Sequence, residues 1–296
     1  MRPLSPTSPA QQANAQAQTS QGTATRRVQQ KFAVFKTPPP GWPTRYWLIP
    51  SVHGDYERLR SVHNTIDQRL LWGDKIIYLG NMMGVSNQVR ATLDEILRFR
   101  SHSLTRKGVF PDDFIYLRGA QEEMWDKLQQ IQFAGDAVSI VTWMLQRGLG
   151  ATLECYGSNE TEALTFARQG VVEMSSWTSR LRASMRAIPG HIQLHASLRR
   201  AALDSDGRLL FVNAGIDPNF TLGGQTDAFW WNSSDIKTLS EPYQGFQRIF
   251  TGYSETHGGI EVYPFATSLD AGAGFGGPLM IACITQDGEF AEVYQA

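Results

Sequence analysis

The chain has 296 residues, of which 42% are hydrophobic and 19% charged, and its net charge is −1. This composition is typical of a globular protein, and the charge balance excludes a chain that binds nucleic acid through overall positive charge. Cys155 and Cys283 are the only cysteines, too few for a disulfide framework or a thiolate zinc site, and no apolar run approaches the roughly 20 residues of a membrane span.

The N-terminal segment differs from the rest of the chain in composition and charge. Residues 1–30 are rich in Gln, Ala, Ser, Thr and Pro without hydrophobic periodicity, and a proline-rich stretch follows. Residues 1–54 hold six basic residues and no acidic one. Such a polar tract buries too little apolar surface to offset the cost of ordering its backbone. We therefore predict a disordered basic arm over residues 1–44 and one folded domain over residues 45–296.

From residue 46 onward, short apolar runs alternate with longer amphipathic segments. Strands that alternate with helices of this length predict βαβ units and a mostly parallel sheet. The strands predicted in the first half are 46–49, 75–79 and 113–117, and the helices are 56–71, 87–100 and 122–132.

The second half begins with a helical pattern over residues 133–200 and then becomes rich in strand patterns. An Asp287-Gly288 pair between the last two strands predicts a hairpin turn. The predicted strands are 209–212, 248–250, 260–262, 279–284 and 289–294.

Four of the apolar runs lead into a glycine-containing motif: Pro50–Gly54, Gly80–Gly84, Arg118–Glu122 and Phe211–Gly215. Glycine lets a backbone turn sharply or approach a ligand closely, and ligands of open α/β sheets bind beyond the carboxyl ends of the strands. One such glycine is ordinary in a βα turn. Four of them in this order indicate a site shared by the strand ends.

These motifs resemble the metal-binding signatures of the PPP-type (calcineurin-like) metallophosphoesterases, in their bacterial form. Residues 80–94 align without a gap with the family's second motif and its helix, and Leu117–Glu122 resembles Arg-Gly-Asn-His-Glu. Phe211–Pro218 resembles Phe-Val-His-Ala-Gly-Ile-x-Pro, and Ser268–Leu279 resembles the closing motif Ile-Asp-Thr-Gly-Ala-x-Phe-Gly-Gly-x-Leu. The likeness covers roughly residues 46–296. It implies an α/β fold, the four-layer metallophosphoesterase sandwich of two mixed β-sheets flanked by helices.

In that family the motifs hold two divalent metals, but this chain carries neutral residues at most ligand positions. Ser51 stands where the resemblance implies a metal-binding Asp, and Asn81 stands where it implies the Asp that bridges both metals. Gly84 replaces another Asp, and Val85 replaces an Arg that binds phosphate. His53 keeps its family identity.

The later motifs have changed in the same direction. Ala120 replaces a ligand Asn, and Gln121 replaces the His thought to protonate the leaving group. Asn213 replaces a ligand His, and Tyr253 replaces the His of the family's Gly-His-Thr motif. The resemblance therefore implies that, of these positions, only His53 is clearly retained. We expect no catalytic residues, no bound metal and no cofactor.

Electrostatics explains the consequence of these replacements. Two divalent cations about 3.5–4 Å apart repel each other by roughly 20 kcal/mol even at an effective dielectric constant near 20. Ser51, Asn81 and Gly84 supply no negative charge to offset this repulsion. Without metals, the attacking water keeps a pKa of about 15.7. Gln121 cannot act as a general acid, and Val85 cannot pair with a phosphate oxygen.

Neighbouring residues leave one alternative open. His53, Asp55 and His257 could hold a single metal, with His63 and Glu255 close to the motifs in sequence. Simpler interpretations exist: Asp55 can cap the helix that starts near residue 56, and His63 lies on that helix. His257 falls in a glycine-rich loop, and His53 can be a hydrogen-bonded remnant.

Two further patterns are interpreted as structural. Phe229–Trp231 could form a binding face, but the relatives have a similar Leu-Trp segment there, which favours packing in the core or at its rim. Gly272–Gly277 matches the letters of a dinucleotide-binding fingerprint. It lies between two strand-like runs and does not open a helix, so we exclude that function.

The favoured hypothesis is a pseudophosphatase, because the glycine frame is kept while the ligands are lost. Such a protein would act by binding another protein, as an adaptor or as a regulatory or structural subunit. The alternative is an active phosphoesterase that hydrolyses phosphoproteins or small phosphate esters at a non-standard single-metal site. A third hypothesis is a component of a larger assembly whose basic arm contacts an acidic partner or nucleic acid. Because the N-terminus lacks the apolar region of a secretory signal, we expect a cytoplasmic protein.

Overall fold

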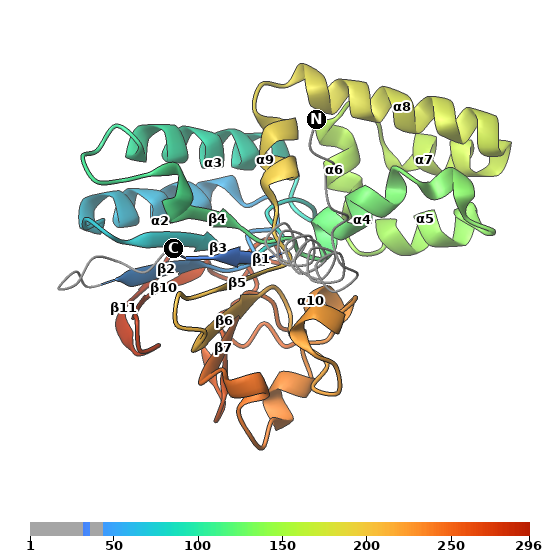
Figure 1. Ribbon diagram of the computed structural model, residues 1–296. Coiled ribbons are helices and arrows are strands. Elements are labelled where there is room, and N and C mark those ends of the chain that lie inside the picture. The colour runs from blue at the N-terminus through green and yellow to red at the C-terminus, as the bar shows by residue number, and fades with distance from the viewer. Residues whose placement is uncertain (1–31, 36–43) are drawn as a thin grey trace, which may run out of the picture.

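Residues 32–35 and 44–296 are described by the computed structural model, and the structural statements below concern these residues. Two β-sheets stack on each other, with helices over the outer face of one sheet (Figure 1). The expected α/β sandwich of two mixed sheets is therefore confirmed. No helix within the described ranges is long and apolar enough to cross a membrane.

The first sheet contains the three parallel strands predicted in the first half of the chain. β2 pairs with β3 and β3 with β4 in parallel, whereas β10 runs antiparallel to both β2 and β11. The Asp287-Gly288 turn joins the last two strands, so the predicted hairpin is confirmed. The order across the sheet is β11 (Phe290–Gln295), β10 (Met280–Thr285), β2 (Arg45–Ile49), β3 (Lys75–Tyr78) and β4 (Phe114–Tyr116).

The second sheet has six strands, and three of them were not predicted. β5 and β9 are three residues long and consist mostly of small side chains, and β1 lies within the predicted arm. The order is β1 (Phe32–Val34), β5 (Ala201–Leu203), β6 (Leu209–Val212), β7 (Arg248–Thr251), β9 (Ala266–Ser268) and β8 (Glu261–Val262).

Alternating side chains of each central strand enter different parts of the core. In β2, Trp47 and Ile49 pack under the helices, whereas Tyr46 and Leu48 face the second sheet. Because both faces are covered, the strand is apolar at successive positions, as expected for a buried parallel strand.

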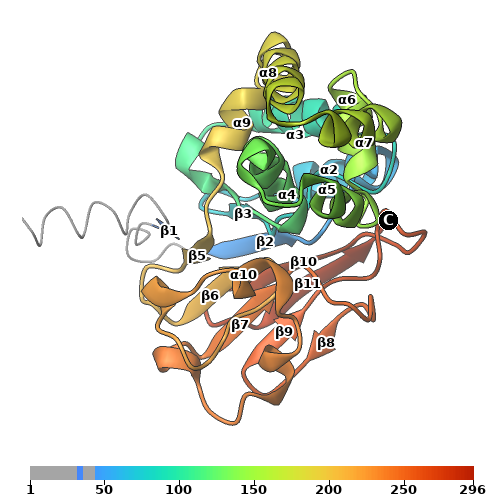
Figure 2. The ribbon, with the colours of Figure 1, turned by 90° about the vertical axis from the view of Figure 1, so that its right-hand side faces the viewer.

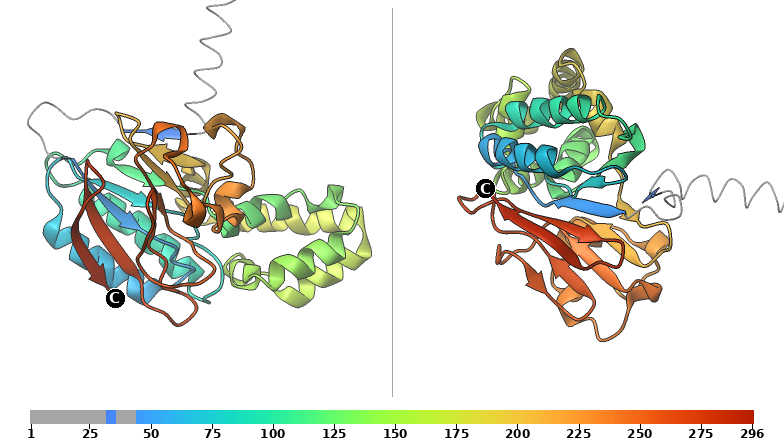
Figure 3. Two further views of the ribbon diagram at one scale, coloured as in Figure 1. Left: turned by 90° about the horizontal axis from the view of Figure 1, so that it is seen from below. Right: turned by 90° about the vertical axis from the view of Figure 1, so that its left-hand side faces the viewer.

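Helices cover the outer face of the first sheet and extend beyond it. Figure 2 shows this helical layer above the two sheets, and Figure 3 shows α5 to α8 projecting to one side of the body. The short helix α10 packs with the second sheet, together with Ala120 at the start of α4. The helices are α2 (Tyr56–Arg69), α3 (Val89–Ser103), α4 (Ala120–Leu128), α5 (Ala137–Leu145), α6 (Leu149–Cys155), α7 (Glu160–Gln169), α8 (Val171–Ala187), α9 (His191–Ser197) and α10 (Ala228–Trp231).

Strand β1 corrects the predicted start of the folded domain. Phe32 and Phe35 are each 4% exposed, and β1 pairs in parallel with β5. The Phe35 ring contacts the Tyr46 ring at a centroid distance of 5.3 Å. Burial of these two rings in the sandwich outweighs the polar composition of the surrounding sequence. The rest of the predicted arm, residues 1–31 and 36–43, lies outside the described residues.

Candidate functional site

The carboxyl ends of strands from both sheets bring the altered motif positions together. Ser51 follows β2, Asn81 follows β3, and Asn213 follows β6. The backbone N–H groups of Gly252 and Tyr253, which follow β7, donate to the Asn213 carbonyl oxygen at 2.8 and 2.9 Å. We call this region the strand-end site.

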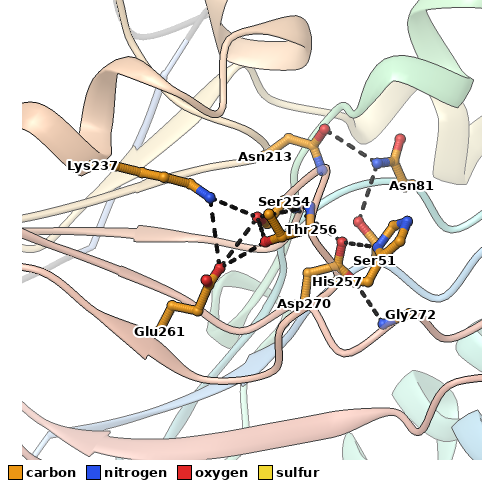
Figure 4. Close-up of polar contacts among 10 residues, drawn as sticks. All are labelled: Ser51, Asn81, Asn213, Lys237, Ser254, Thr256, His257, Glu261, Asp270 and Gly272. Atoms are coloured by element: carbon orange, nitrogen blue, oxygen red, sulfur yellow. Dashed lines mark hydrogen bonds and ion pairs between the residues drawn. The ribbon is translucent and has the colours of Figure 1, made fainter.

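Asn81 is the centre of the hydrogen bonds in this site (Figure 4). Its Nδ2 donates to Ser51 Oγ at 3.1 Å and to Asn213 Oδ1 at 3.3 Å, while its Oδ1 accepts from the Gln121 backbone N–H at 3.0 Å. Asn213 Nδ2 donates in turn to the Leu79 carbonyl oxygen at 2.7 Å. Both amides are fully buried, so they satisfy each other inside the protein.

This donor set does not fit the two-metal centre that the fold family implies. The amino group of Asn81 donates to the oxygens of Ser51 and Asn213, so a cation beside those oxygens would meet N–H groups. No carboxylate stands at these positions to balance its charge, and hard cations favour carboxylate and carbonyl oxygens. Within the described part of the chain, no group of three or more His, Cys, Asp or Glu residues is arranged to hold a metal.

The Gln121 side chain packs against Gly84 so closely that position 84 has no room for a side chain. Gly84 has φ +84°, and a Cβ atom there would lie 2.1 Å from Gln121 Oε1. The Gln121 side chain is fixed by a 2.7 Å hydrogen bond from Nε2 to the Arg147 carbonyl oxygen. It therefore fills the space that an Asp at position 84 would need.

Val85 and Ala120 also lack the groups that metal or phosphate would need. Val85 adopts a left-handed conformation with φ +58°, held by a 2.9 Å hydrogen bond from its N–H to the Gly148 carbonyl oxygen. This conformation is uncommon for a β-branched residue. Ala120 is 7% exposed and packs among apolar residues that include Phe229.

His53, the retained residue, is buried and 2% exposed. Within the described residues no side chain bonds to either ring nitrogen, and the polar neighbour of the imidazole is the Met83 backbone, so the expected hydrogen-bonded remnant stays a prediction. Burial lowers the pKa of His53 to about 4, although the nearby Asp270 charge opposes this shift. The imidazole is therefore neutral at pH 7. Its neighbours are the rings of Phe275 and Tyr253, at centroid distances of 5.1 and 6.3 Å.

Two residues proposed as alternative ligands have structural roles instead. Asp55 caps α2 by accepting from the Arg58 backbone N–H at 3.3 Å, as the sequence predicted, and it also pairs with the Arg58 guanidinium at 2.7 Å. His63 is buried in the core, where its Nδ1 lies 2.8 Å from Glu95 and its Nε2 lies 2.8 Å from the Tyr78 hydroxyl. Glu255 is exposed.

An aspartate–histidine pair at this site was not assigned from the sequence. Asp270 is 1% exposed, and its Oδ2 lies 2.8 Å from His257 Nδ1 and accepts from the Ser254 N–H at 2.9 Å (Figure 4). The hydrogen bond to Asp270 raises the pKa of His257. Asp270 lies inside the closing motif, and this position was the one sequence feature that could have identified it as a site residue. The pair orients the imidazole, whose ring stacks on Phe275 at 4.8 Å.

The loop beside this pair is fixed by hydroxyl groups. Ser254 Oγ lies 2.8 Å from Thr256 Oγ1, and Glu261 Oε2 accepts from both hydroxyls, at 3.3 and 3.1 Å (Figure 4). Lys237 Nζ donates to Ser254 Oγ at 3.4 Å. These contacts hold the chain that leads from Tyr253 toward β8.

The Glu122 carboxylate holds the turn after β3 in place. The sequence analysis placed Glu122 in a motif but assigned it no role. Its Oε1 accepts from the N–H groups of Met82 and Met83 at 2.8 and 3.2 Å. Its Oε2 accepts from the N–H groups of Asn81 and Gly119, both at 2.9 Å. One buried carboxylate therefore satisfies four backbone donors and positions Asn81.

The two patterns interpreted as structural are confirmed. Phe229 is 0% exposed and Trp230 is 5% exposed, so both lie in the core, whereas Trp231 is half-buried beside Trp143 at 5.3 Å. Gly272–Gly277 lies between β9 and β10 and opens no helix.

Comparison with known proteins identifies the fold. No protein-family model and no curated sequence matches the chain. Among solved structures, a candidate diadenosine tetraphosphatase is 11% identical, with a TM-score of 0.50 over 90% of this chain and 98% of that one.

Two other similar structures have lower TM-scores, and no conclusion rests on them. A serine/threonine phosphatase from Saccharomyces cerevisiae is 10% identical, with a TM-score of 0.45 over 90% of this chain and 82% of that one. A metallophosphoesterase from Sphaerobacter thermophilus is 12% identical, with a TM-score of 0.43 over 86% and 88%. Together with the motif order, the first similarity shows that the chain has the fold of the calcineurin-like metallophosphoesterases.

Proposed function

We propose that this protein is a pseudophosphatase, which uses the phosphoesterase fold to bind another protein without hydrolysing phosphate esters. The observation that carries the proposal is the closed hydrogen bonding of Asn81 with Ser51 and Asn213. In a two-metal enzyme of this fold, the positions of Ser51 and Asn81 would supply carboxylate ligands and the position of Asn213 an imidazole ligand. Here they bind one another, and none of them is charged.

Three neighbouring features support this function. Gln121 fills the space beside Gly84, so restoring an acid at position 84 alone would create a steric clash. His53 is neutral near pH 7, and within the described residues no side chain bonds to its ring nitrogens. Phe275 is 53% exposed next to the strand-end site, and an exposed aromatic ring of this kind suits protein binding better than phosphate chemistry.

Metal content and turnover, measured on the same preparation, test the loss of catalysis. The purified full chain would be incubated with Mn²⁺, desalted, analysed for metal and assayed with p-nitrophenyl phosphate, beside an active metallophosphoesterase. We expect substoichiometric Mn²⁺ and the same background rate for the natural chain and for His53→Ala. Stoichiometric Mn²⁺ together with a rate that His53→Ala or His257→Ala abolishes would instead establish the single-metal phosphoesterase.

A truncation tests where a partner is bound. Removing residues 1–31 leaves β1 and its pairing with β5 in place. Partners captured by the full chain and by the truncated chain would be compared by quantitative mass spectrometry. We expect the folded domain to keep its partner as an adaptor or regulatory subunit would. Loss of capture with the arm would favour an assembly component that binds an acidic partner or nucleic acid through residues 1–31.

A further inference from the structure

A cavity of about 710 Å³ lies along the edge strands of the two sheets, away from the strand-end site. β1 and β4, the edge strands that line it, belong to different sheets. Lys75 and Phe114, which also line it, begin β3 and β4, whereas the altered motifs follow the ends of their strands. The volume is within the range of about 300–1,000 Å³ that is typical of small-molecule sites.

Two arginines at this cavity have no acidic partner among the described residues. Arg100 comes from α3, and Arg199 follows α9, and both are half-buried. Within the described part of the chain, the Arg199 side chain donates to the Leu198 carbonyl oxygen at 3.3 Å and makes no other hydrogen bond. By contrast, the nearby Lys75 forms an ion pair with Asp113. Asp112, which also lines the cavity, is not without a partner either. We call this region the Arg100–Arg199 cavity.

A buried hydroxyl beside the same cavity also lacks a partner. Tyr116, at the end of β4, is 5% exposed, and its hydroxyl makes no hydrogen bond within the described residues. Burial raises the pKa of Tyr116, and the positive charge of Arg100 acts against that shift, which places the two groups near each other. Buried polar groups in folded proteins nearly always have a partner, so this hydroxyl is free to donate to a ligand in the cavity.

The remaining walls combine apolar and polar side chains. Phe32, Leu97 and Leu194 line the cavity, and Phe110 lies at it with 57% of its surface exposed. Asp112, Asp113, Gln193 and Ser197 also line it. A ligand that combines an anionic group with an apolar body can use both the arginines and the apolar side chains. Guanidinium groups match phosphate oxygens in a two-pronged geometry, and two guanidiniums balance the double negative charge of a phosphate monoester.

We propose that the Arg100–Arg199 cavity binds an aromatic phosphate monoester of nucleotide size. Arg100 and Arg199 hold the phosphate, and the exposed Phe110 ring packs against the aromatic body. The Tyr116 hydroxyl donates to an oxygen of the ligand. This site is separate from the strand-end site, so it stands or falls independently of the pseudophosphatase function.

Calorimetric titration of the full chain tests the proposal with adenosine 5′-monophosphate, phenylphosphonate, adenosine and inorganic phosphate. We expect the first two to bind, inorganic phosphate to bind more weakly, and uncharged adenosine to show no measurable binding. Arg100→Gln and Arg199→Gln should each weaken the binding of adenosine 5′-monophosphate at least tenfold. Arg199→Lys, which keeps the charge but loses the planar fork, should give an intermediate affinity.

The matched control is Arg186→Gln, an exposed position on α8 away from the cavity, which should leave the affinity unchanged. Thermal unfolding of every variant verifies that it is folded. Adenosine binding as tightly as adenosine 5′-monophosphate would overturn the proposal, as would failure of both anionic aromatic probes at millimolar concentration. Binding that survives both Gln variants but is lost in His53→Ala would place the anion at the strand-end site and also overturn it.

Discussion

At the strand-end site the side chains of Asn81, Ser51 and Asn213 bind one another, whereas the two arginines that line the Arg100–Arg199 cavity are not paired in this way within the described residues. Asn81 and Asn213 are buried and share a hydrogen bond, and no charge is present on either. Arg100 and Arg199 carry charge and have no acidic partner among the described residues. Both regions are built on the same two sheets, so the fold alone does not decide where a ligand binds.

The two regions differ in whether these polar side chains already have partners within the protein. A site whose donors and acceptors pair internally gains little from a polar ligand, because each new contact replaces an existing one. A site whose cations have no acidic partner among the described residues gains new contacts from an anionic ligand. We therefore expect a small anionic ligand to favour the Arg100–Arg199 cavity over the strand-end site.

The largest effect is expected at the scaffold of the strand-end site. Glu122→Gln places an amino group against two backbone N–H donors and removes the charge from four hydrogen bonds, so we expect a loss of about 4 kcal/mol in the free energy of unfolding. The neighbouring Glu123 is 7% exposed and forms ion pairs with the partly exposed Arg118 and the exposed Lys127. Glu123→Gln keeps an amide oxygen that can accept from Arg118, so it should cost about 1 kcal/mol. Urea unfolding measures both, and equal losses would contradict the scaffold role.

The pH dependence of stability tests the burial of His53. Between pH 6.5 and about 4, the unfolded chain takes up a proton that the folded chain does not, so stability falls as the pH decreases. The loss reaches about 3 kcal/mol below pH 4 and vanishes above pH 6.5. His53→Asn keeps a residue that tolerates the φ of +51° and should remove this part of the pH dependence.

His102→Asn, at an exposed position on α3, is the control and should keep the pH dependence of the natural chain. Denaturant unfolding at a series of pH values gives the slopes. An unchanged slope in His53→Asn would mean that His53 is protonated in the fold, and therefore that its surroundings are more polar than the structure shows.

A double-mutant cycle measures the mutual dependence of Gly84 and Gln121. Gly84→Ala adds a left-handed alanine and a clash with the Gln121 side chain, whereas Gly157→Ala adds only the first, because nothing lies within 4 Å of its Cβ position. We expect Gly84→Ala to cost about 2 kcal/mol more than Gly157→Ala, whose strain is about 1–2 kcal/mol. In a Gln121→Ala background most of the excess should disappear. Equal costs in both backgrounds would contradict the steric coupling.

The smallest effect is expected at the Arg100–Arg199 cavity without a ligand. Tyr116→Phe removes a buried hydroxyl that has no partner, so the free energy of unfolding should stay unchanged or rise by less than about 1 kcal/mol. Tyr78→Phe removes a hydroxyl that bonds to His63 at 2.8 Å and should instead cost about 1 kcal/mol. A similar loss at both positions would show that Tyr116 already has a partner.

Much of the fold followed from local patterns in the sequence. Apolar runs such as residues 46–49 and 75–79 predict strands by their residue types, and the Asp287-Gly288 pair predicts its turn by its own backbone preference. Strand β1 did not follow, because Phe32–Phe35 is a short run in polar sequence. It becomes a strand only through its pairing with β5 and through burial in the sandwich.

The candidate site was also predicted only in part. The glycine motifs located Ser51, Asn81 and Asn213, but not the partner that each side chain takes. The Asp270–His257 pair and the role of Glu122 were not predicted. His257 and Asp270 are 13 residues apart, and three of the four donors bound by Glu122 are 39 to 41 residues away, so these contacts form only once neighbouring strands have paired.

By itself, the sequence determined that the altered motif positions of the strand-end site are neutral, because Ser, Asn, Gly, Val, Ala and Gln side chains are neutral wherever they are placed. Only the tertiary structure decided that Asn81 closes on Ser51 and Asn213, and that Arg100 and Arg199 line one cavity. The physical reason is that charge and the number of hydrogen-bond donors and acceptors are properties of a single residue. Whether each donor finds an acceptor depends on distances between residues, which only the packing of the chain sets.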